Sequence, residues 1–514
     1  MNLHSYLHRA LVAAALVIAI PTVAHADNFA QTEQCSAQTD DCQLALDCAT
    51  TVFSRPGVRF MHKVRTACPK ATVTVRHLPK GLQWNARRKV VEGTVKKAGS
   101  YTYQIVVGSG NGSRSHDVSL TVSDQLALPV PFMGWLSWNS VQGDVSESIV
   151  RQMVELFKQT GLYEAGWNYI MMDDLWQAGQ RAADGSPQPD AVRFPHGLKP
   201  LADYVHEQGM KFGNYTDEAD KTCAGAFGTH GYEAIDAQTY AQWGIDVVKC
   251  DYCHAPTEAD TAKARYSAFA EALKAAGSKT MLYICEWGDR KPWTWGAEAG
   301  GVCWRVSGDV RDCWTGKDGG IGVVESIKAM KDISAYGGVN RFNDADMLCT
   351  GLHGTGKSSN DLCGGAGPGM TQDEYRTQFA LWCMWSSPMA LSFDPRQGSV
   401  TADDYQMLTN RRLIALNQDP MGQQADPVQE GTPDLLMLAK DLENGDVALS
   451  VTNLGDVERT ATFRFALIPH LDMQQSYAAT DLWTGQQLPT VSTGELRTQV
   501  RPHATQVFRL QKVQ

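Results

Sequence analysis

The sequence lacks an excess of positive charge. Its 514 residues include 46 lysines and arginines against 56 aspartates and glutamates, which gives a formal net charge of -10 at pH 7. Nucleic acids and anionic membranes attract proteins through basic clusters, so this balance argues against both kinds of partner. A chain of this length exceeds one ordinary hydrophobic core, and we expect two or three domains.

The sequence also lacks a hydrophobic run that could span a membrane. The apolar run at residues 10–20 is shorter than the roughly 20 residues that a span needs, and no later segment qualifies. Arg9 precedes this run and Ala24-His25-Ala26 follows it, which is the pattern of a cleavable signal peptide. We therefore predict a signal peptide at residues 1–26 and export to the periplasm or the medium; a short membrane anchor is the competing interpretation.

Paired zinc-binding cysteine motifs are absent as well. Among 13 cysteines, Cys250 and Cys253 have CxxC spacing, but an aspartate lies between them and no second pair follows, which disfavours a metal or redox site. In an exported chain the cysteines indicate disulfides, and the odd count leaves at least one without a partner in the chain. We expect two bridges within one small domain among the four early cysteines, Cys35, Cys42, Cys48 and Cys68.

Three regions differ in hydrophobic patterning. Residues 27–125 and 427–514 alternate short β-rich runs with turn residues, so each predicts a β-sandwich. The first looks like the immunoglobulin-like modules of exported bacterial proteins, and we expect it to act as a spacer or to dock carbohydrate or protein. In residues 131–420, β-rich runs alternate with helical patterns such as residues 146–161. Eight β-then-α units in about 290 residues predict an α/β fold, the closed parallel (β/α)8 barrel.

Charged and aromatic side chains gather where the predicted barrel strands end, which is where the active site of such a barrel forms. Helix capping explains any one of these carboxylates, but not acids at the ends of six strands, because like charges at one rim raise one another's pKa. Tryptophans among the acids suit a sugar, whose hydroxyls need acceptors and whose C–H faces stack on indole. These residues are Asp173, Asp174, Asp217, Lys249, Asp251, Glu286, Arg305, Asp309, Asp344 and Asp346, with Trp138, Trp176, Trp287 and Trp304.

Two of the acids suit the two roles in glycosidic-bond cleavage. The nucleophile has to stay ionised, and Lys249 lies two residues before Asp251, on the same face of the strand. We expect Asp251 as the nucleophile. We expect Asp309 as the general acid, since this role requires a retained proton and other acids lie across the rim. One competing interpretation is a non-catalytic carbohydrate-binding barrel, which would lack one of these acids. Another is metal-dependent hydrolysis, with oxygen ligands from Asp173, Asp174, Asp344 and Asp346.

Seven motifs follow one another through residues 131–420. They are MGWLSWN (133–139), YIMMDDLW (169–176), RFPHGLKPLADYVHEQGMKFGNY (193–215), WGIDVVKCDYC (243–253), ICEWG (284–288), WRVSGDVRDCW (304–314) and NDADML (343–348). In this order they resemble glycoside hydrolase family 27, the family of α-galactosidases and α-N-acetylgalactosaminidases. The resemblance implies a retaining mechanism through a covalent galactosyl-enzyme, with no cofactor and no metal.

The resemblance also implies roles for single residues. Asp251 matches the family's nucleophile and Asp309 its acid/base, and a disulfide is implied between Cys223 and Cys253. Glu286 and Trp287, after Cys285, are expected to meet C2 of the sugar, where they would accept a hydroxyl and exclude an acetamide. The positions implied to hold galactose are Trp138, Asp173, Asp174, Tyr215, Lys249, Arg305 and Asp346.

The chain departs from the family pattern at Cys250, where tyrosine is usual, at Tyr252, where asparagine is usual, and in NDADM, where NDPDM is common. These departures bear on the subsite beyond galactose more than on the chemistry. We predict hydrolysis of terminal α-D-galactosyl residues from oligosaccharides or polysaccharides. The alternatives with the same fold and mechanism are β-L-arabinopyranosides, since the family contains such enzymes, and α-N-acetylgalactosaminides.

Overall fold

The computed structural model describes residues 44–110, 112–357, 367–429, 434–492 and 494–513. The predicted signal peptide and two of the early cysteines, Cys35 and Cys42, lie outside the described residues. In these ranges no helix combines the length and the apolar character needed to cross a bilayer.

The first β domain consists of two sheets around a common core. The four-stranded sheet has the order β1-β7-β6-β3 and the three-stranded sheet the order β2-β5-β4. In β6, Tyr103, Ile105 and Val107 are buried while their neighbours are more exposed, which is the alternation expected of a sandwich. The strands are β1 (Thr51–Ser54), β2 (Arg59–Lys63), β3 (Thr72–Arg76), β4 (Leu82–Asn85), β5 (Val90–Thr94), β6 (Gly99–Ser109) and β7 (Gly112–Val122).

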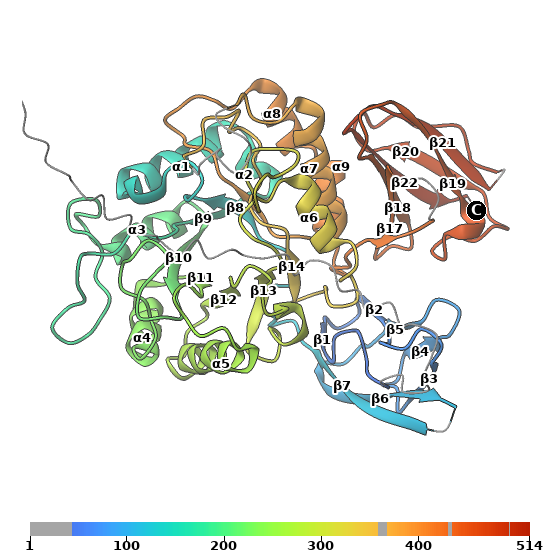
Figure 1. The fold of residues 1–514 in the computed structure, drawn as a ribbon, viewed down its shortest axis with the longest axis horizontal. Coiled ribbons are helices and arrows are strands. Elements are labelled where there is room, and N and C mark those ends of the chain that lie inside the picture. The colour runs from blue at the N-terminus through green and yellow to red at the C-terminus, as the bar shows by residue number, and fades with distance from the viewer. Residues whose placement is uncertain (1–43, 111, 358–366, 430–433, 493, 514) are drawn as a thin grey trace, which may run out of the picture. The chain divides into compact units, whose positions relative to one another are not determined.

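Parallel strands form the predicted barrel (Figure 1). An eight-stranded sheet has the order β14-β13-β12-β11-β10-β9-β8-β15, and a parallel bridge between Leu348 and Leu391 joins its two ends. The prediction of a closed (β/α)8 barrel is confirmed. The strands are β8 (Met133–Leu136), β9 (Tyr169–Met171), β10 (Lys211–Asp217), β11 (Val247–Asp251), β12 (Met281–Ile284), β13 (Gly301–Arg305), β14 (Phe342–Asp344) and β15 (Met389–Leu391).

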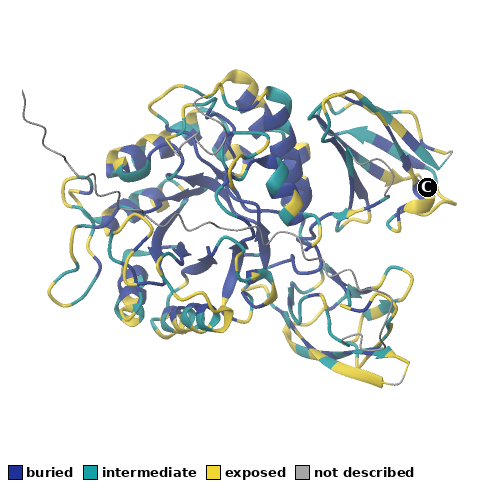
Figure 2. Cartoon of the chain, viewed as in Figure 1, coloured by how far each residue is buried: buried dark blue, intermediate teal, exposed yellow. Residues whose placement is uncertain are grey.

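Amphipathic helices cover the barrel. In α1 the Ser146 side chain accepts a hydrogen bond from the backbone N–H of Ile149, and Ile149, Val150, Met153 and Phe157 form the buried stripe. The helices are α1 (Glu147–Gln159), α2 (Leu162–Ala165), α3 (Leu198–Glu207), α4 (Glu233–Trp243), α5 (Ala259–Ala275), α6 (Val323–Met330), α7 (Gln372–Trp385), α8 (Ala402–Leu408) and α9 (Arg411–Asn417). Figure 2 shows the barrel strands as buried, whereas the outer faces of several helices are exposed.

The C-terminal β domain also has two sheets, as the sequence predicts. One has the order β16-β17-β18-β22-β20 and the other pairs β19 with β21. Leu449, Val451, Phe463 and Phe508 belong to its core. The strands are β16 (Asp426–Pro427), β17 (Leu435–Asp441), β18 (Val447–Asn453), β19 (Arg459–Arg464), β20 (Tyr477–Asp481), β21 (Glu495–Val500) and β22 (Thr505–Lys512).

The early cysteines differ from expectation. Cys48 is a buried free thiol, whereas Cys68 is disulfide-bonded. The prediction of two bridges among the four early cysteines is therefore wrong. Cys48 is only 5% exposed and packs as a small apolar side chain.

Candidate active site

The end of β11 holds a buried lysine between two carboxylates. The Nζ atom of Lys249 lies 2.7 Å from Oδ2 of Asp173 and 3.6 Å from Oδ1 of Asp251. Burial by itself would lower the pKa of Lys249, but Asp173 and Asp251 raise it well above its usual value. The lysine therefore stays charged, and its charge compensates for the burial of the two acids.

Asp251 is held from a second side by the neighbouring strand. The hydroxyl of Tyr215, on β10, donates a hydrogen bond of 2.9 Å to Oδ2 of Asp251. Burial raises the pKa of Asp251 to about 6, while Lys249 acts in the opposite direction. Asp251 is thus oriented by a hydroxyl and an ammonium group, and it is ionised at neutral pH.

Arg305, at the end of β13, links two further acids. It is fully buried and forms ion pairs of 2.9 Å with Asp346 and 3.1 Å with Asp309. Nη2 of Arg311 lies 3.9 Å from Oδ2 of Asp309. Burial raises the pKa of Asp309, but Arg305, Lys249 and Arg311 hold it below its usual value. The sequence hypothesis expected other acids to help Asp309 keep its proton, whereas cations dominate its surroundings.

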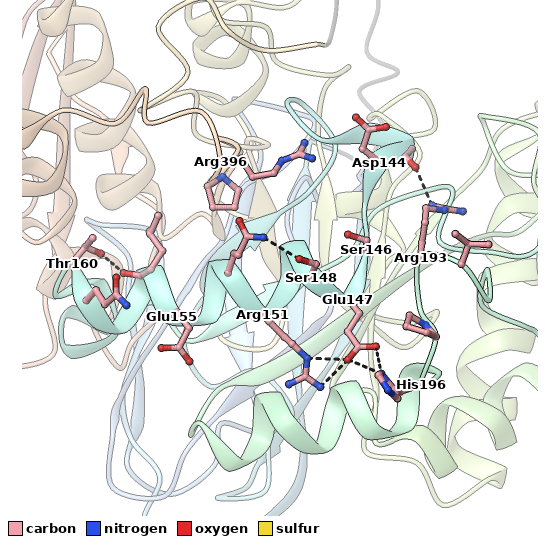
Figure 3. Close-up of a pocket in the computed structure, with 17 residues that line it drawn as sticks. Asp144, Ser146, Glu147, Ser148, Arg151, Glu155, Thr160, Arg193, His196 and Arg396 are labelled. Carbon is pink, nitrogen blue, oxygen red and sulfur yellow. Dashed lines mark hydrogen bonds and ion pairs between the residues drawn. The ribbon is translucent and has the colours of Figure 1, made fainter.

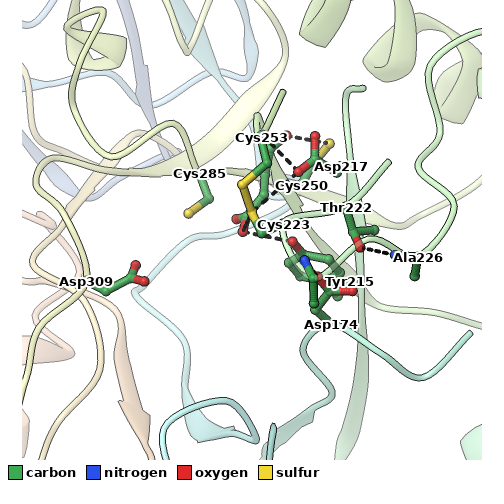
Figure 4. Close-up of a disulfide and its surroundings, with 12 residues drawn as sticks. Asp174, Tyr215, Asp217, Thr222, Cys223, Ala226, Cys250, Cys253, Cys285 and Asp309 are labelled. Atoms are coloured by element: carbon green, nitrogen blue, oxygen red, sulfur yellow. Dashed lines mark hydrogen bonds between the residues drawn. A yellow bond between two sulfur atoms is a disulfide. The ribbon is translucent and has the colours of Figure 1, made fainter. Parts of the chain in front are cut away.

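Asp174 lies on a different part of the rim. Its Oδ2 accepts a hydrogen bond of 2.8 Å from the backbone N–H of Ala224, and its Oδ1 accepts one of 2.7 Å from that of Leu175. Burial raises the pKa of Asp174. Figure 4 shows Asp174 beside Tyr215, with Asp309 on the other side of the view.

The structure contains the disulfide Cys223–Cys253 that the family resemblance implies, with a Cα–Cα distance of 5.1 Å. The Sγ atom of Cys223 lies 3.3 Å from Oδ2 of Asp251, and the backbone N–H of Cys253 donates 2.9 Å to Oδ2 of Asp217 (Figure 4). Burial, followed by the charge of Asp251, raises the pKa of Asp217 to about 9. Asp217 therefore keeps its proton near neutral pH and adds no further negative charge beside Asp251.

Cys285 belongs to this network, although the sequence analysis gave the neighbouring Glu286 the main role. Lys249 pairs in register with Tyr283, so Cys285, two residues further, lies level with Asp251. Cys285 is among the groups that lower the pKa of Asp251, and Nη1 of Arg305 lies 3.9 Å from its sulfur. The alternation of inward positions along β12 was the signal that could have identified it.

Glu286 points into a different environment. Its Oε2 accepts hydrogen bonds of 2.8 Å from the backbone N–H and 3.0 Å from Nη1 of Arg290. Trp287 is half-buried, and Trp138 is half-buried against the core cluster that contains Met171. Direct contacts form two groups: Lys249 and Tyr215 hold Asp251, with Asp173 on the lysine, and Arg305 holds Asp309 and Asp346. The charge of Lys249 also lowers the pKa of Asp309, which links the two groups into one ion network. Among the described residues, the hydrogen bonds and ion pair of Glu286 are made with Arg290 and do not join this network.

The competing metal interpretation finds no support in the geometry. Asp173 and Asp346 are paired with Lys249 and Arg305, and the hydroxyl of Tyr283 donates to Asp344. Among the residues that the structure describes, the four acids named for that interpretation do not form a cluster of metal-ligand spacing. The cations of the chain itself fill the role that a metal would have there.

A wide pocket of about 1110 Å³ lies elsewhere, along α1 (Figure 3). Its carboxylate Glu147 is paired with Arg151 at 2.9 Å and with His196 at 3.0 Å. The pocket contains none of the strand-end residues. We therefore place the candidate site at the barrel rim, where the buried ion network lies.

Comparisons with known proteins identify the family and the domains of the chain. The family model described as "Alpha galactosidase A" matches residues 130–419, "Alpha galactosidase C-terminal beta sandwich domain" matches residues 432–510, and an Ig domain model matches residues 57–123. An α-galactosidase A from Cellvibrio japonicus is 35% identical over 79% of this chain and 98% of its own length. An α-galactosidase from Cyamopsis tetragonoloba is 34% identical over 74% of this chain and 86% of its own length.

A solved structure of an α-galactosidase is also similar to this chain. The crystal structure of α-galactosidase I from Mortierella vinacea matches with a TM-score of 0.67 and 29% identity, covering 75% of this chain and 98% of that one. The family model spans the whole barrel, and the relatives match over most of their length. The chain therefore belongs to glycoside hydrolase family 27, as an α-galactosidase.

Proposed function

We propose that this enzyme is a retaining exo-glycosidase that releases terminal α-D-galactosyl residues, with Asp251 as nucleophile and Asp309 as acid/base. The observation that supports this assignment most directly is the buried ion network. Lys249 and Tyr215 hold Asp251, while Arg305 connects Asp309 to Asp346. The two acids therefore have different partners, as their two roles require.

The proposed reaction has two steps. In the first, an oxygen of Asp251 forms a bond to C1 of the galactosyl unit while the bond from C1 to the leaving oxygen breaks, and Asp309 gives its proton to that oxygen. In the second, Asp309 takes a proton from water as the water oxygen attacks C1, which releases Asp251. Lys249 and Tyr215 favour the return of negative charge to Asp251 in this second step.

The two acids share one proton in the reactive form. In the structure without sugar, the pKa of Asp251 is raised to about 6 and that of Asp309 is lowered, so this proton resides mainly on Asp251. The productive form has the same number of protons, with the proton on Asp309. Activity should therefore depend on the proton count of the pair, and it should fall when that last proton is lost.

We expect kcat/KM to fall about tenfold per pH unit on the alkaline side, starting near pH 6. Arg311→Met removes a cation from Asp309, so the pKa of Asp309 should rise and more of the shared proton should lie on Asp309. The plateau of kcat/KM below the alkaline limb should then rise relative to the wild type, while the limb itself stays near pH 6. Arg311→Lys keeps the charge and should leave the plateau closer to that of the wild type. The measurement is the pH profile of kcat/KM for an aryl α-D-galactopyranoside. A plateau that does not rise in Arg311→Met would argue that the proton is not shared with Asp309.

The loop after β12 supports a preference for a hydroxyl at C2. Cys285 lies beside Asp251, and the bulky Trp287 follows it on the chain, whereas the charge of Glu286 is paired with Arg290. Discrimination against an acetamide should thus rest on the bulk of Trp287 and on the polar surroundings of Cys285. The acetamide would have to displace protein atoms and leave its own polar groups without partners.

We expect kcat/KM for aryl α-D-galactopyranoside to exceed that for the α-N-acetylgalactosaminide by about 100-fold or more. Trp287→Ala should reduce this ratio. Trp293→Ala is a matched control, because Trp293 is also half-buried against the same core. A preference of the wild type for the acetamido sugar would contradict the proposal. A preference for aryl β-L-arabinopyranoside, assayed alongside, would keep the mechanism but change the sugar.

We also infer that the enzyme is exported and acts on α-galactoside oligosaccharides or polysaccharides. The signal-peptide pattern supports export, and so does the disulfide beside Asp251, since disulfides persist in oxidising compartments. The N-terminal β domain holds none of the rim residues, so a spacer or docking role for carbohydrate or protein suits it better than catalysis.

A further inference from the structure

A buried carboxylate follows β10 and finds no hydrogen-bond donor among the described residues. Glu218 is the next residue after Asp217, and its side chain is 0% exposed. Neither Oε1 nor Oε2 accepts a hydrogen bond from any described residue. Arg265 lies nearby, but its Nη1 donates to the backbone oxygen of Glu218, at 2.8 Å. A buried carboxylate in this state needs either a proton or a cation.

Two further ligand-type atoms converge on this carboxylate. The Nδ1 atom of His230 lies 3.8 Å from Oε2 of Glu218 and 3.4 Å from Oε1 of Glu233. This nitrogen is itself enclosed and has no hydrogen-bond partner in the described part of the chain. One ligand atom from each of the three side chains lies within 4.8 Å of the others. Ligands held tetrahedrally at zinc distances are about 3.3 Å apart, so these spacings are close to those around one ion.

Backbone N–H groups position the segment of His230 and the side chain of Glu233. The N–H of His230 donates to the carbonyl of Ala219, at 3.3 Å, which ties His230 to the segment that contains Glu218. The N–H of Gly231 donates 3.0 Å to Oε1 of Glu233, the first residue of α4, and so orients that carboxylate. Such supporting contacts are typical of metal ligands, because they fix the donor atoms before the ion binds.

We propose that Glu218, His230 and Glu233 bind one divalent transition-metal ion of the Zn²⁺ type. One imidazole nitrogen and two carboxylate oxygens suit Zn²⁺, whereas Ca²⁺ takes six to eight oxygen ligands. The ion would satisfy both the buried carboxylate and the enclosed nitrogen. This departs from the expectation, from the sequence and the family resemblance, that the chain binds no metal.

The role of the ion is structural. The N–H of Glu218 donates 2.9 Å to the backbone carbonyl of Asp251, so the ion would stabilise the segment that flanks the proposed nucleophile. No step of glycoside hydrolysis passes through this ion. A second cluster, Asp217 with Cys223 and Cys253, has similar spacing but is unsuitable, because its cysteines are joined in a disulfide and offer no thiolate.

The experiment is a titration of the full-length protein with Zn²⁺ by calorimetry, after a chelator has been applied and dialysed away. We expect one ion per chain with a dissociation constant of about 1 μM or below, and a higher melting temperature with Zn²⁺ present. Glu218→Gln and His230→Ala should each weaken binding by about 100-fold or more, since each removes a ligand. Ca²⁺ at the same concentration should not compete.

His206→Ala is the matched control. His206 is as exposed as His230, at 37% against 36%, but it faces the single carboxylate of Asp246, at 2.8 Å. This variant should bind Zn²⁺ like the wild type. Absence of binding in the wild type, or equal binding in the wild type, Glu218→Gln and His230→Ala, would overturn the proposed site. Loss of turnover on chelation that Zn²⁺ restores, without any change in melting temperature, would overturn the structural role given to the ion.

Discussion

Asp251→Asn should lower kcat/KM for aryl α-D-galactopyranoside by about 10⁴-fold or more, with little change in the fold. The amide of asparagine is a poor nucleophile, so the covalent galactosyl-enzyme cannot form. The substitution keeps the shape of the side chain, and Lys249 keeps its contact of 2.7 Å with Asp173. The loss of rate should therefore come from the chemistry rather than from unfolding.

The measurement combines steady-state kinetics with circular dichroism and a melting curve. Asp419→Asn is a suitable control, because Asp419 is also a buried carboxylate that accepts hydrogen bonds, from the backbone of Met421 and Glu443, but is not a member of the ion network. It should retain most of the wild-type activity. A near-native rate in Asp251→Asn would remove Asp251 from the mechanism.

Asp309→Ala should separate substrates by their leaving groups. Loss of a general acid costs about 10² to 10⁴-fold where the leaving oxygen needs a proton, as in an α-galactosyl oligosaccharide. A galactoside with a good leaving group, such as dinitrophenolate, needs little protonation and should lose much less in the first step. Arg305 keeps its ion pair with Asp346, at 2.9 Å, so the rim should keep its arrangement in the variant.

Added azide gives an independent measurement on the same variant. Without Asp309 no base activates water, and the small azide anion, which needs no base, should intercept the intermediate as an α-galactosyl azide. The α configuration reports two successive inversions at C1, and hence retention. Equal losses on both kinds of substrate, together with no azide adduct, would argue that another residue is the acid/base.

Much of the fold can be predicted from local sequence patterns. The alternation in TYQIVV of β6, the helical stripe of α1 and the β-rich runs that precede polar residues all depend on side-chain direction over a few residues. The same period along a strand places Lys249 and Asp251, two residues apart, on one face of β11. Side-chain direction repeats with a fixed period along a strand or helix, so these features need no knowledge of distant parts of the chain.

Contacts between strands were decided only by the tertiary structure. Sequence reasoning placed Glu286 toward the sugar, but the register of β11 with β12 brings Cys285 level with Asp251, and Glu286 pairs with Arg290. Likewise, Asp309 was expected among acids, whereas the folded chain surrounds it with cations such as Arg305. Register and pKa depend on neighbours from other strands, and sequence spacing does not specify those neighbours.

The cluster of Glu218, His230 and Glu233 also combines features that local sequence determines with features that only the tertiary structure decides. None of the three stands in a recognised metal-binding spacing, and the chain turns through a loop between the first and the other two. Local patterns determined the strand that ends before Glu218 and the region in which the acids gather. Burial of Glu218 beside His230 arises from the path of that loop over the barrel, because desolvation and donor geometry exist only after distant segments have packed together.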